Sequence, residues 1–169
     1  MKKTITTACG ILLSLLLEMT IFHTWRIWGV KPDLVLTWTV LVGLLCGQPA
    51  GIAAGAVGGI LVDIQVGRFI GLSMATGLLV GWLGGQVGTR AFREHWFVPV
   101  GAVGFCTLVG EAFYLFLGNS FGLGWPLWQA IYQVVVPTAL YNMLFAMAIW
   151  PLARKLFVDE PKYVVWGRG

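Results

Sequence analysis

The stretch that decides the fold runs from Gly43 to Asp63 and reads GLLCGQPAGIAAGAVGGILVD. Glycine recurs at every fourth position of this stretch, at Gly43, Gly47, Gly51, Gly55 and Gly59. Because residues i and i+4 share one face of a helix, the glycines from 51 to 59 predict a helix face without side chains. Pro49 interrupts the run, so we expect a turn between two helices there, the second of which ends at Asp63.

A second stripe with the same spacing follows at Gly77, Gly81 and Gly85. In lipid, small residues four apart let two helix backbones approach closely. Two interpretations remain open: the two stripes pack on each other, or one of them binds a partner helix. We expect internal packing for residues 77–85 and a partner contact for the end of the first stripe near Asp63.

Composition identifies the class of protein. Of 169 residues, 58% are hydrophobic and only 11% are charged, whereas soluble domains carry about 25% charged residues. The chain is therefore predicted to be an all-α integral membrane protein with one domain. Its net charge of +4 reflects basic residues between and after apolar runs, which indicates membrane topology rather than binding to nucleic acid.

Six apolar segments are predicted to cross the membrane, at 5–25, 34–46, 51–64, 69–87, 97–117 and 126–150. They form a transmembrane domain of residues 1–158, followed by a cytoplasmic tail of residues 159–169. The second segment is short for a crossing of about 30 Å, so a re-entrant hairpin with the third segment is an alternative. Pro137 is expected to kink the sixth segment.

Basic residues set the predicted orientation. With six crossings and a cytoplasmic N-terminus, eight Lys and Arg residues fall inside and three outside. The three outer ones are Arg26, Lys31 and Arg68. The positive-inside rule then predicts a multi-pass protein of the bacterial inner membrane with both termini in the cytoplasm.

Ionisable side chains inside a membrane are candidates for function. Glu18 and Glu111 lie within predicted crossings, and Asn142 lies in the sixth. For Glu111 we expect a hydrogen bond that joins helices, to Asn142 or Gln133, with a ligand site or a partner contact as alternatives.

Three further acidic or basic residues mark segment ends. Asp33 is expected to favour the positive N-terminus of the second segment. Asp63 and Arg68 are expected to form a local surface pair, with a helix cap or a docking contact as alternatives.

Catalytic and metal-binding patterns do not appear in the sequence. There is no nucleophile elbow, no phosphate-binding glycine loop and no spacing typical of metal ligands. We therefore expect no enzyme activity and no cofactor.

The stretch from Pro32-Asp33 through the glycine repeat and residues 58–63 (GGILVD) to Gly71-Leu72 resembles the MreD family, the rod shape-determining membrane proteins of bacteria. The resemblance implies six helices, similar to the substrate-binding subunits of energy-coupling-factor transporters. It implies a non-enzymatic component of the cell-elongation machinery that binds MreC. MreB, RodA and a class B penicillin-binding protein would be direct or indirect partners, with membrane lipid around the helices. A small-molecule-binding subunit of a transporter is the alternative function.

Overall fold

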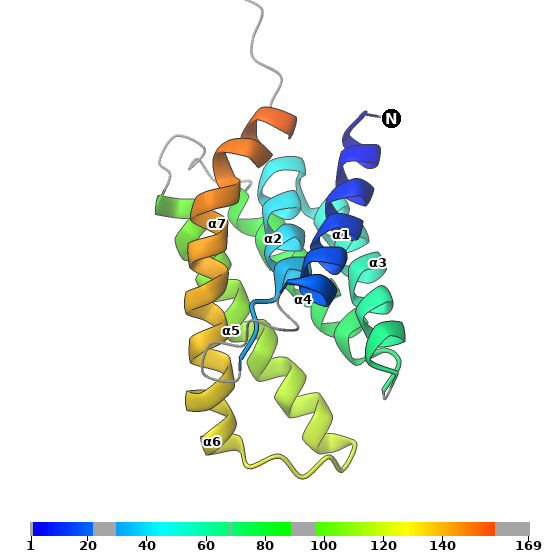
Figure 1. The fold of residues 1–169 in the computed structure, drawn as a ribbon, viewed down its shortest axis with the longest axis vertical. Helices are drawn as coiled ribbons and strands as arrows, with labels where there is room; N and C mark the ends of the chain where they lie inside the picture. The colour runs from blue at the N-terminus through cyan, green and yellow to red at the C-terminus, as the bar shows by residue number, and fades with distance from the viewer. Residues whose placement is uncertain (1, 22–29, 68, 89–96, 158–169) are drawn as a thin grey trace, which may run out of the picture.

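The computed structural model describes residues 2–21, 30–67, 69–88 and 97–157 as a bundle of helices (Figure 1). The helices in chain order are α1 (Lys2–Thr20), α2 (Leu34–Cys46), α3 (Gln48–Val66), α4 (Leu72–Gly88), α5 (Phe97–Ser120), α6 (Leu127–Ala130), a π-helical turn η1 (Ile131–Val135) and α7 (Val136–Phe157). Because α6, η1 and α7 follow one another without a break, they form one long helical stretch. The six predicted segments are therefore each found as a helix.

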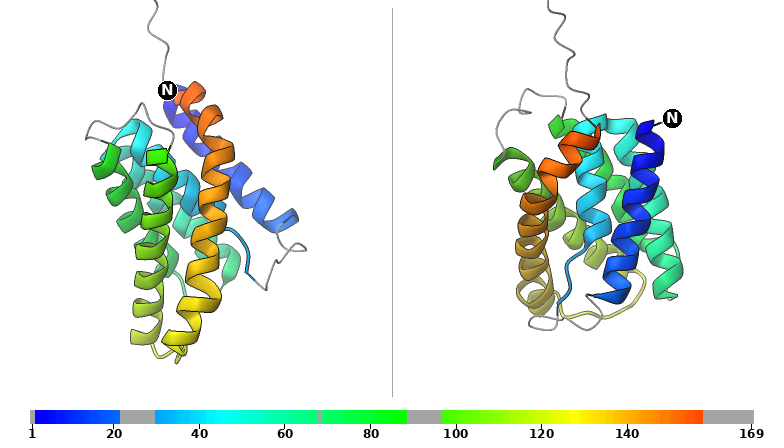
Figure 2. Two further views of the ribbon diagram at one scale, coloured as in Figure 1. Left: turned by 90° about the vertical axis from the view of Figure 1, so that its left-hand side faces the viewer. Right: turned by 45° about the horizontal axis from the view of Figure 1, so that its top comes forward.

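Helix α2 lies in the middle of the bundle, and Figure 2 shows the other helices arranged around it. It packs against α1, α3, α4, α5 and α7. Every residue from Leu34 to Leu45 is buried, as expected for a helix that is apolar on all sides. At 13 residues it is about 20 Å long. The turn at Gly47, which has a φ of 91°, lies at the end of the bundle that carries the N-terminus (Figure 1).

Trp38 attaches α1 and α7 to this central helix. Its indole Nε1 donates a hydrogen bond of 3.2 Å to the carbonyl oxygen of Thr7 on α1. Gly10 leaves room for the ring, because a Cβ there would overlap the indole. The ring centroid of Phe157, the last residue of α7, is 5.7 Å from that of Trp38.

The glycine stripes of α3 and α4 pack on each other. A Cβ at Gly55 would overlap the backbone of Gly77, and a Cβ at Gly81 would overlap that of Gly51. The predicted internal packing is thus confirmed. At the other end of the stripe, Gly59 also lies against α4, at the backbone of Ser73 and Met74. A partner contact near Asp63 stays a prediction.

Within the described ranges, four helical stretches are long and apolar enough to cross a membrane: α1, α3, α5 and the stretch Leu127–Phe157. Helices α2 and α4 are shorter, at 13 and 17 residues. The all-helical membrane architecture predicted from composition is therefore confirmed. Helix α5 extends to Ser120 and, beside α7, continues beyond the other helices (Figure 2).

The irregularity expected at Pro137 is found as the π-helical turn directly before it. The amide of Val136 donates to the carbonyl of Ile131, five residues earlier. Proline has no N–H to donate, and its ring would clash with the carbonyl four residues earlier. The wider π turn lies directly before Pro137, where the ring would otherwise meet that carbonyl.

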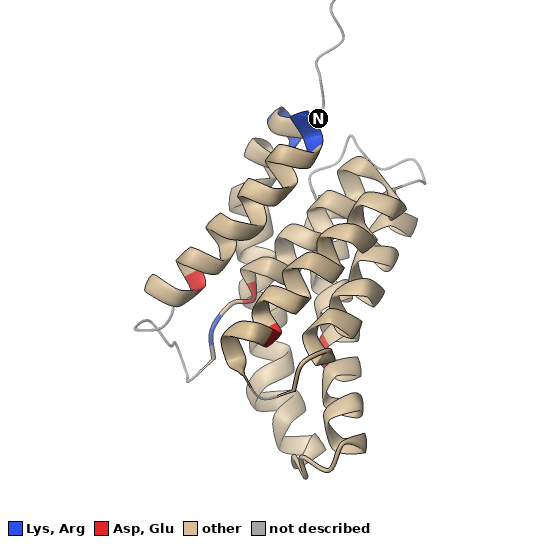
Figure 3. Ribbon diagram, turned by 90° about the vertical axis from the view of Figure 1, so that its right-hand side faces the viewer, with Lys and Arg blue, Asp and Glu red and all other residues tan. Residues whose placement is uncertain are grey.

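The beginning of α1 and the end of α7 lie at one end of the bundle. Lys2 and Lys3 begin α1, and Arg154 and Lys155 lie in the last turn of α7. Figure 3 shows these basic residues together at the top of the view, with the acidic residues nearer the middle. An even number of crossings requires this arrangement. The predicted boundary between residues 158 and 159 lies outside the described residues.

Candidate functional site

The N-terminus of α2 is held by two carboxylates. Glu18, in the last turn of α1, accepts hydrogen bonds from the amides of Leu34 (2.6 Å) and Val35 (3.1 Å). Asp33 is the N-cap, and its Oδ1 accepts from the amide of Leu36 at 2.7 Å. These are amides that a helix cannot satisfy internally, and negative charge also favours the positive end of the helix dipole. The expected position of Asp33 at the N-terminus is confirmed.

Glu18 is 4% exposed, and its Oε2 is 3.9 Å from the Nζ of Lys31. Lys31 and Asp33 belong to the segment between α1 and α2, so all three charges meet where that segment enters the bundle. Burial raises the pKa of the Asp33 carboxyl above its ordinary value, opposed by the hydrogen bond from Leu36 and by the charge of Lys31.

Asn142, on α7, makes hydrogen bonds at the same N-terminus of α2. Its Oδ1 accepts from the amide of Asp33 at 2.9 Å, and its Nδ2 donates to Thr107 on α5 at 3.1 Å. Both ends of the amide are therefore engaged, and the side chain is fully buried. The predicted hydrogen bond from Asn142 to Glu111 is wrong, because Asn142 instead joins α2, α5 and α7.

Asp63 caps a different helix from the one that carries it. Its carboxylate accepts from the amides of Gly71 (2.8 Å), Ser73 (2.9 Å) and Met74 (3.1 Å) at the start of α4. The residue is 2% exposed, so Asp63 is not a surface residue, and the alternative of a helix cap is confirmed. Arg68 lies outside the described residues, so its pairing with Asp63 stays a prediction.

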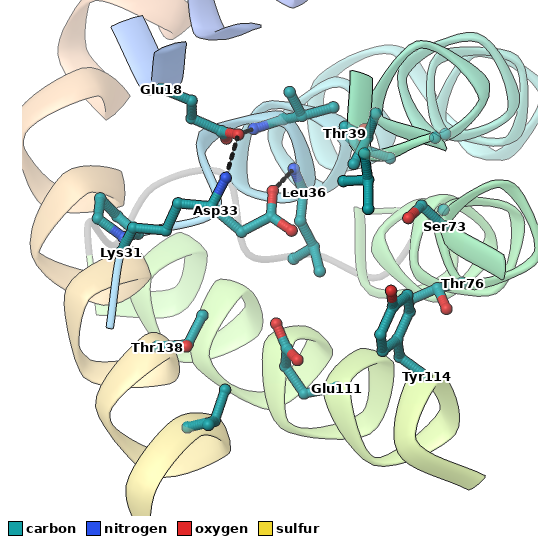
Figure 4. A pocket seen from close by; sticks show the side chains of 18 of the residues that line it. Glu18, Lys31, Asp33, Leu36, Thr39, Ser73, Thr76, Glu111, Tyr114 and Thr138 are labelled. Atoms are coloured by element: carbon teal, nitrogen blue, oxygen red, sulfur yellow. Dashed lines mark hydrogen bonds and ion pairs between the residues drawn. The ribbon is translucent and has the colours of Figure 1, made fainter. Parts of the chain in front are cut away.

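A cavity of about 390 Å³ lies beside these two capped helix ends, in the half of the bundle away from the termini. Figure 4 shows the side chains that line it. Its walls come from α1, the segment before α2, and α2, α3, α4, α5, η1 and α7. The cavity exists because α2 begins partway through the bundle, so the outer halves of the surrounding helices have no central helix between them. We call it the acidic cavity, after the carboxyl groups of Glu18, Asp33 and Glu111 in its wall.

Glu111 faces the acidic cavity from α5 (Figure 4). Among the described residues we find no hydrogen bond to its carboxyl group. Gln133, its other predicted partner, is exposed. The expectation that Glu111 joins helices by a hydrogen bond is therefore wrong, and its carboxyl group is instead available within the cavity.

Neutral polar groups complete the lining. Tyr114 on α5 and Ser73 on α4 both line the cavity (Figure 4), and the ring of Tyr114 stacks on Trp125 with centroids 5.8 Å apart. Asn119 holds Trp125 in place by accepting from its amide (2.8 Å) and donating to its carbonyl (3.2 Å). The loop after α5 thereby supports one wall of the cavity.

Sequence reasoning found the carboxyl groups but missed Lys31, Thr39, Tyr114 and Thr138 as cavity residues. A threonine in an apolar helix gives no signal by itself, because it can satisfy its hydroxyl on the backbone of its own helix. The predicted glycines 55, 59 and 77 do line the cavity, whereas Gly47, Gly51, Gly81 and Gly85 do not.

Comparison with known families gives one match. A model of rod shape-determining protein MreD matches residues 1–159. The chain belongs to the MreD family. No curated protein and no solved structure matches it.

Membership of the MreD family assigns the chain a role in determining rod shape. It also confirms the resemblance drawn from residues 32–72, and the acidic cavity is thus a feature of an MreD-family chain. The similarity to the substrate-binding subunits of energy-coupling-factor transporters stays a prediction.

Proposed function

We propose that this MreD-family chain is a non-enzymatic component of the bacterial cell-elongation machinery and that it binds MreC. Through MreC it would link the MreB cytoskeleton to RodA and a class B penicillin-binding protein, and so to peptidoglycan synthesis. The observation that carries this proposal is the family match over residues 1–159.

The proposed location is the inner membrane, with both termini in the cytoplasm. Lys2, Lys3, Arg154 and Lys155 at one end of the bundle support this orientation. Reporter fusions test it: a fusion after Asn119 should be active in the periplasm, and one after Gly169 in the cytoplasm. A periplasmic signal at Gly169 would contradict the proposed topology.

The proposed contact with MreC would lie away from the two glycine stripes, because they already pack against each other. A single transmembrane helix of MreC would use another face of the bundle. Co-purification from native membranes in mild detergent tests the contact, with an unrelated multi-pass protein as the control. Absence of MreC from a chain recovered at normal levels would contradict the proposal.

The second candidate function is a small-molecule-binding subunit of a transporter, and the acidic cavity is the observation that favours it. Ligand sites are concave and mostly apolar, with a few polar groups that orient the ligand, and they have volumes of about 300–1,000 Å³. The cavity, at about 390 Å³, meets that description. Binding of a small molecule by the purified chain, in the absence of MreC, distinguishes this function from a purely structural one.

A further inference from the structure

We infer that the acidic cavity binds a ligand that carries an ammonium group, with the cation placed between the carboxylates of Asp33 and Glu111. This inference specifies the ligand that the second candidate function leaves open. It does not depend on binding to MreC.

The first argument is the balance of charge. The described residues that line the cavity include three carboxyl groups and one cation, Lys31. The Nζ of Lys31 lies 3.9 Å from the Oε2 of Glu18. Glu18 also accepts hydrogen bonds from two backbone amides. Asp33 accepts the amide of Leu36, and Glu111 has no hydrogen bond within the described residues. The wall therefore holds more carboxyl oxygens than the chain's own donors satisfy, and an ammonium group would donate to both side chains and favour their charged form.

The second argument is a pair of hydroxyl groups that are open to the cavity. Thr39 on α2 and Thr138 on α7 line the cavity and are 1% and 3% exposed. Within the described part of the chain neither hydroxyl makes a hydrogen bond, whereas Thr37 and Thr76 donate to the carbonyls four residues earlier. Every buried side-chain nitrogen or oxygen of the described residues has a hydrogen-bond partner, so these two hydroxyls are accessible from the cavity. They can hydrogen bond with polar atoms of a ligand.

The third argument is the rest of the wall. Val62 and Val66 on α3 and Val134 in η1 give the cavity an apolar side next to its carboxyl groups. Such a wall fits an ammonium group attached to a hydrocarbon body better than a small hydrated ion. No group of three His, Cys, Asp or Glu side chains in the described ranges is placed to hold a metal ion.

Two sources can supply this chemistry: a free organic amine, or a phospholipid with an ammonium headgroup. The free-amine probe is hexylammonium, titrated into the purified full-length chain in a non-ionic detergent, with hexanol and hexanoate as matched controls. The lipid probe is native mass spectrometry of the chain from nanodiscs that contain equal amounts of phosphatidylethanolamine and phosphatidylglycerol.

The deciding variant is Glu111→Gln, which keeps the shape of the side chain and removes its charge. A hydrogen bond to a charged group contributes enough that its loss should weaken hexylammonium binding by about tenfold to a hundredfold. Thr39→Val tests the hydroxyl contact, with an expected loss of about fivefold. Lys155→Gln, at the opposite end of the bundle, removes one charge outside the cavity and should leave binding unchanged.

Binding of hexylammonium that falls in Glu111→Gln, or retention of phosphatidylethanolamine over phosphatidylglycerol that is lost in Glu111→Gln, supports the inference and identifies the source. Three results would overturn it: hexanoate binding as tightly as hexylammonium, neither probe binding the wild-type chain, or Glu111→Gln binding both probes as the wild type does. MreC is absent throughout, so these failures leave the proposed assembly untouched.

Discussion

The α3–α4 seam and the acidic cavity lie side by side but are built in opposite ways. In the seam, glycine faces glycine and the two backbones touch, so no side chain separates them. In the cavity, side chains from several helices surround a space that none of them fills. Gly55, Gly59 and Gly77 belong to both regions, because the outer part of the seam forms one wall of the cavity. The comparison teaches that close packing of α3 and α4 stabilises the bundle, whereas the cavity is free to bind something.

The largest effect is expected in the seam, from Gly55→Leu. The new side chain would overlap the backbone of Gly77, which cannot move aside as a side chain can. We expect a loss of about 3 kcal/mol or more in the free energy of unfolding, with depletion of the protein from the membrane. Ala53→Leu, at an exposed position of the same helix, is the control. Equal membrane levels for the two variants would show that the seam is not tightly packed.

Asp63→Ala should follow, because three amides of α4 lose their acceptor at once. An unsatisfied buried donor costs about 1–3 kcal/mol, and water can reach some of these amides, so we expect a net loss of about 2–3 kcal/mol. Asp63→Asn keeps one acceptor oxygen and should lose less. Thermal unfolding in detergent measures both, and identical melting of Asp63→Ala and wild type would refute the cap.

Glu18→Leu should cost about 1–2 kcal/mol, since it removes the acceptor for the amides of Leu34 and Val35 while Asp33 still caps the helix. Glu18→Gln, which retains an acceptor, is the matched control. If the two variants have the same melting temperature, the hydrogen bonds contribute nothing to stability, and any effect of Glu18 comes from its charge.

Glu111→Leu should have the smallest effect, within about 1 kcal/mol of wild type. The described residues give its carboxyl group no hydrogen bond, so leucine strands no donor or acceptor. Thermal unfolding beside Glu18→Leu sharpens the comparison between a carboxylate that caps a helix and one that faces a cavity. A loss as large as that of Glu18→Leu would mean that Glu111 stabilises the fold after all.

The seam was predictable from sequence and the cavity was not, for a physical reason. Glycines four apart share a helix face whatever surrounds the helix, so local spacing was enough to predict two helix faces without side chains. Spacing left open whether those faces pack on each other or on a partner helix. The partners of Asn142 lie 109 and 35 residues away, and no spacing rule connects α7 with the N-terminus of α2.

The cap made by Asp63 is intermediate in how far it could be predicted from sequence. Its carboxylate oxygens accept from amides 8 to 11 residues later, a separation set by a short turn between two helices. A carboxylate in the last turn of one helix, followed by a glycine turn and another helix, is therefore a pattern from which the cap could have been predicted.

Glu18 and Asp63 each cap the helix that follows their own, and this has a consequence for membrane insertion during biosynthesis. Each acidic side chain lies on the earlier helix of a pair, and the amides that donate to it lie at the start of the later helix. The carboxyl groups of α1 and α3 therefore have their hydrogen bonds only when α1 is paired with α2 and α3 with α4. A carboxylate in a single helix is costly in lipid. Each pair of helices would therefore enter the lipid most favourably as a unit, with the carboxylate already hydrogen-bonded to the helix that follows it. A nascent chain arrested after α1 or after α3 should be retained there longer than one arrested after α2 or α4.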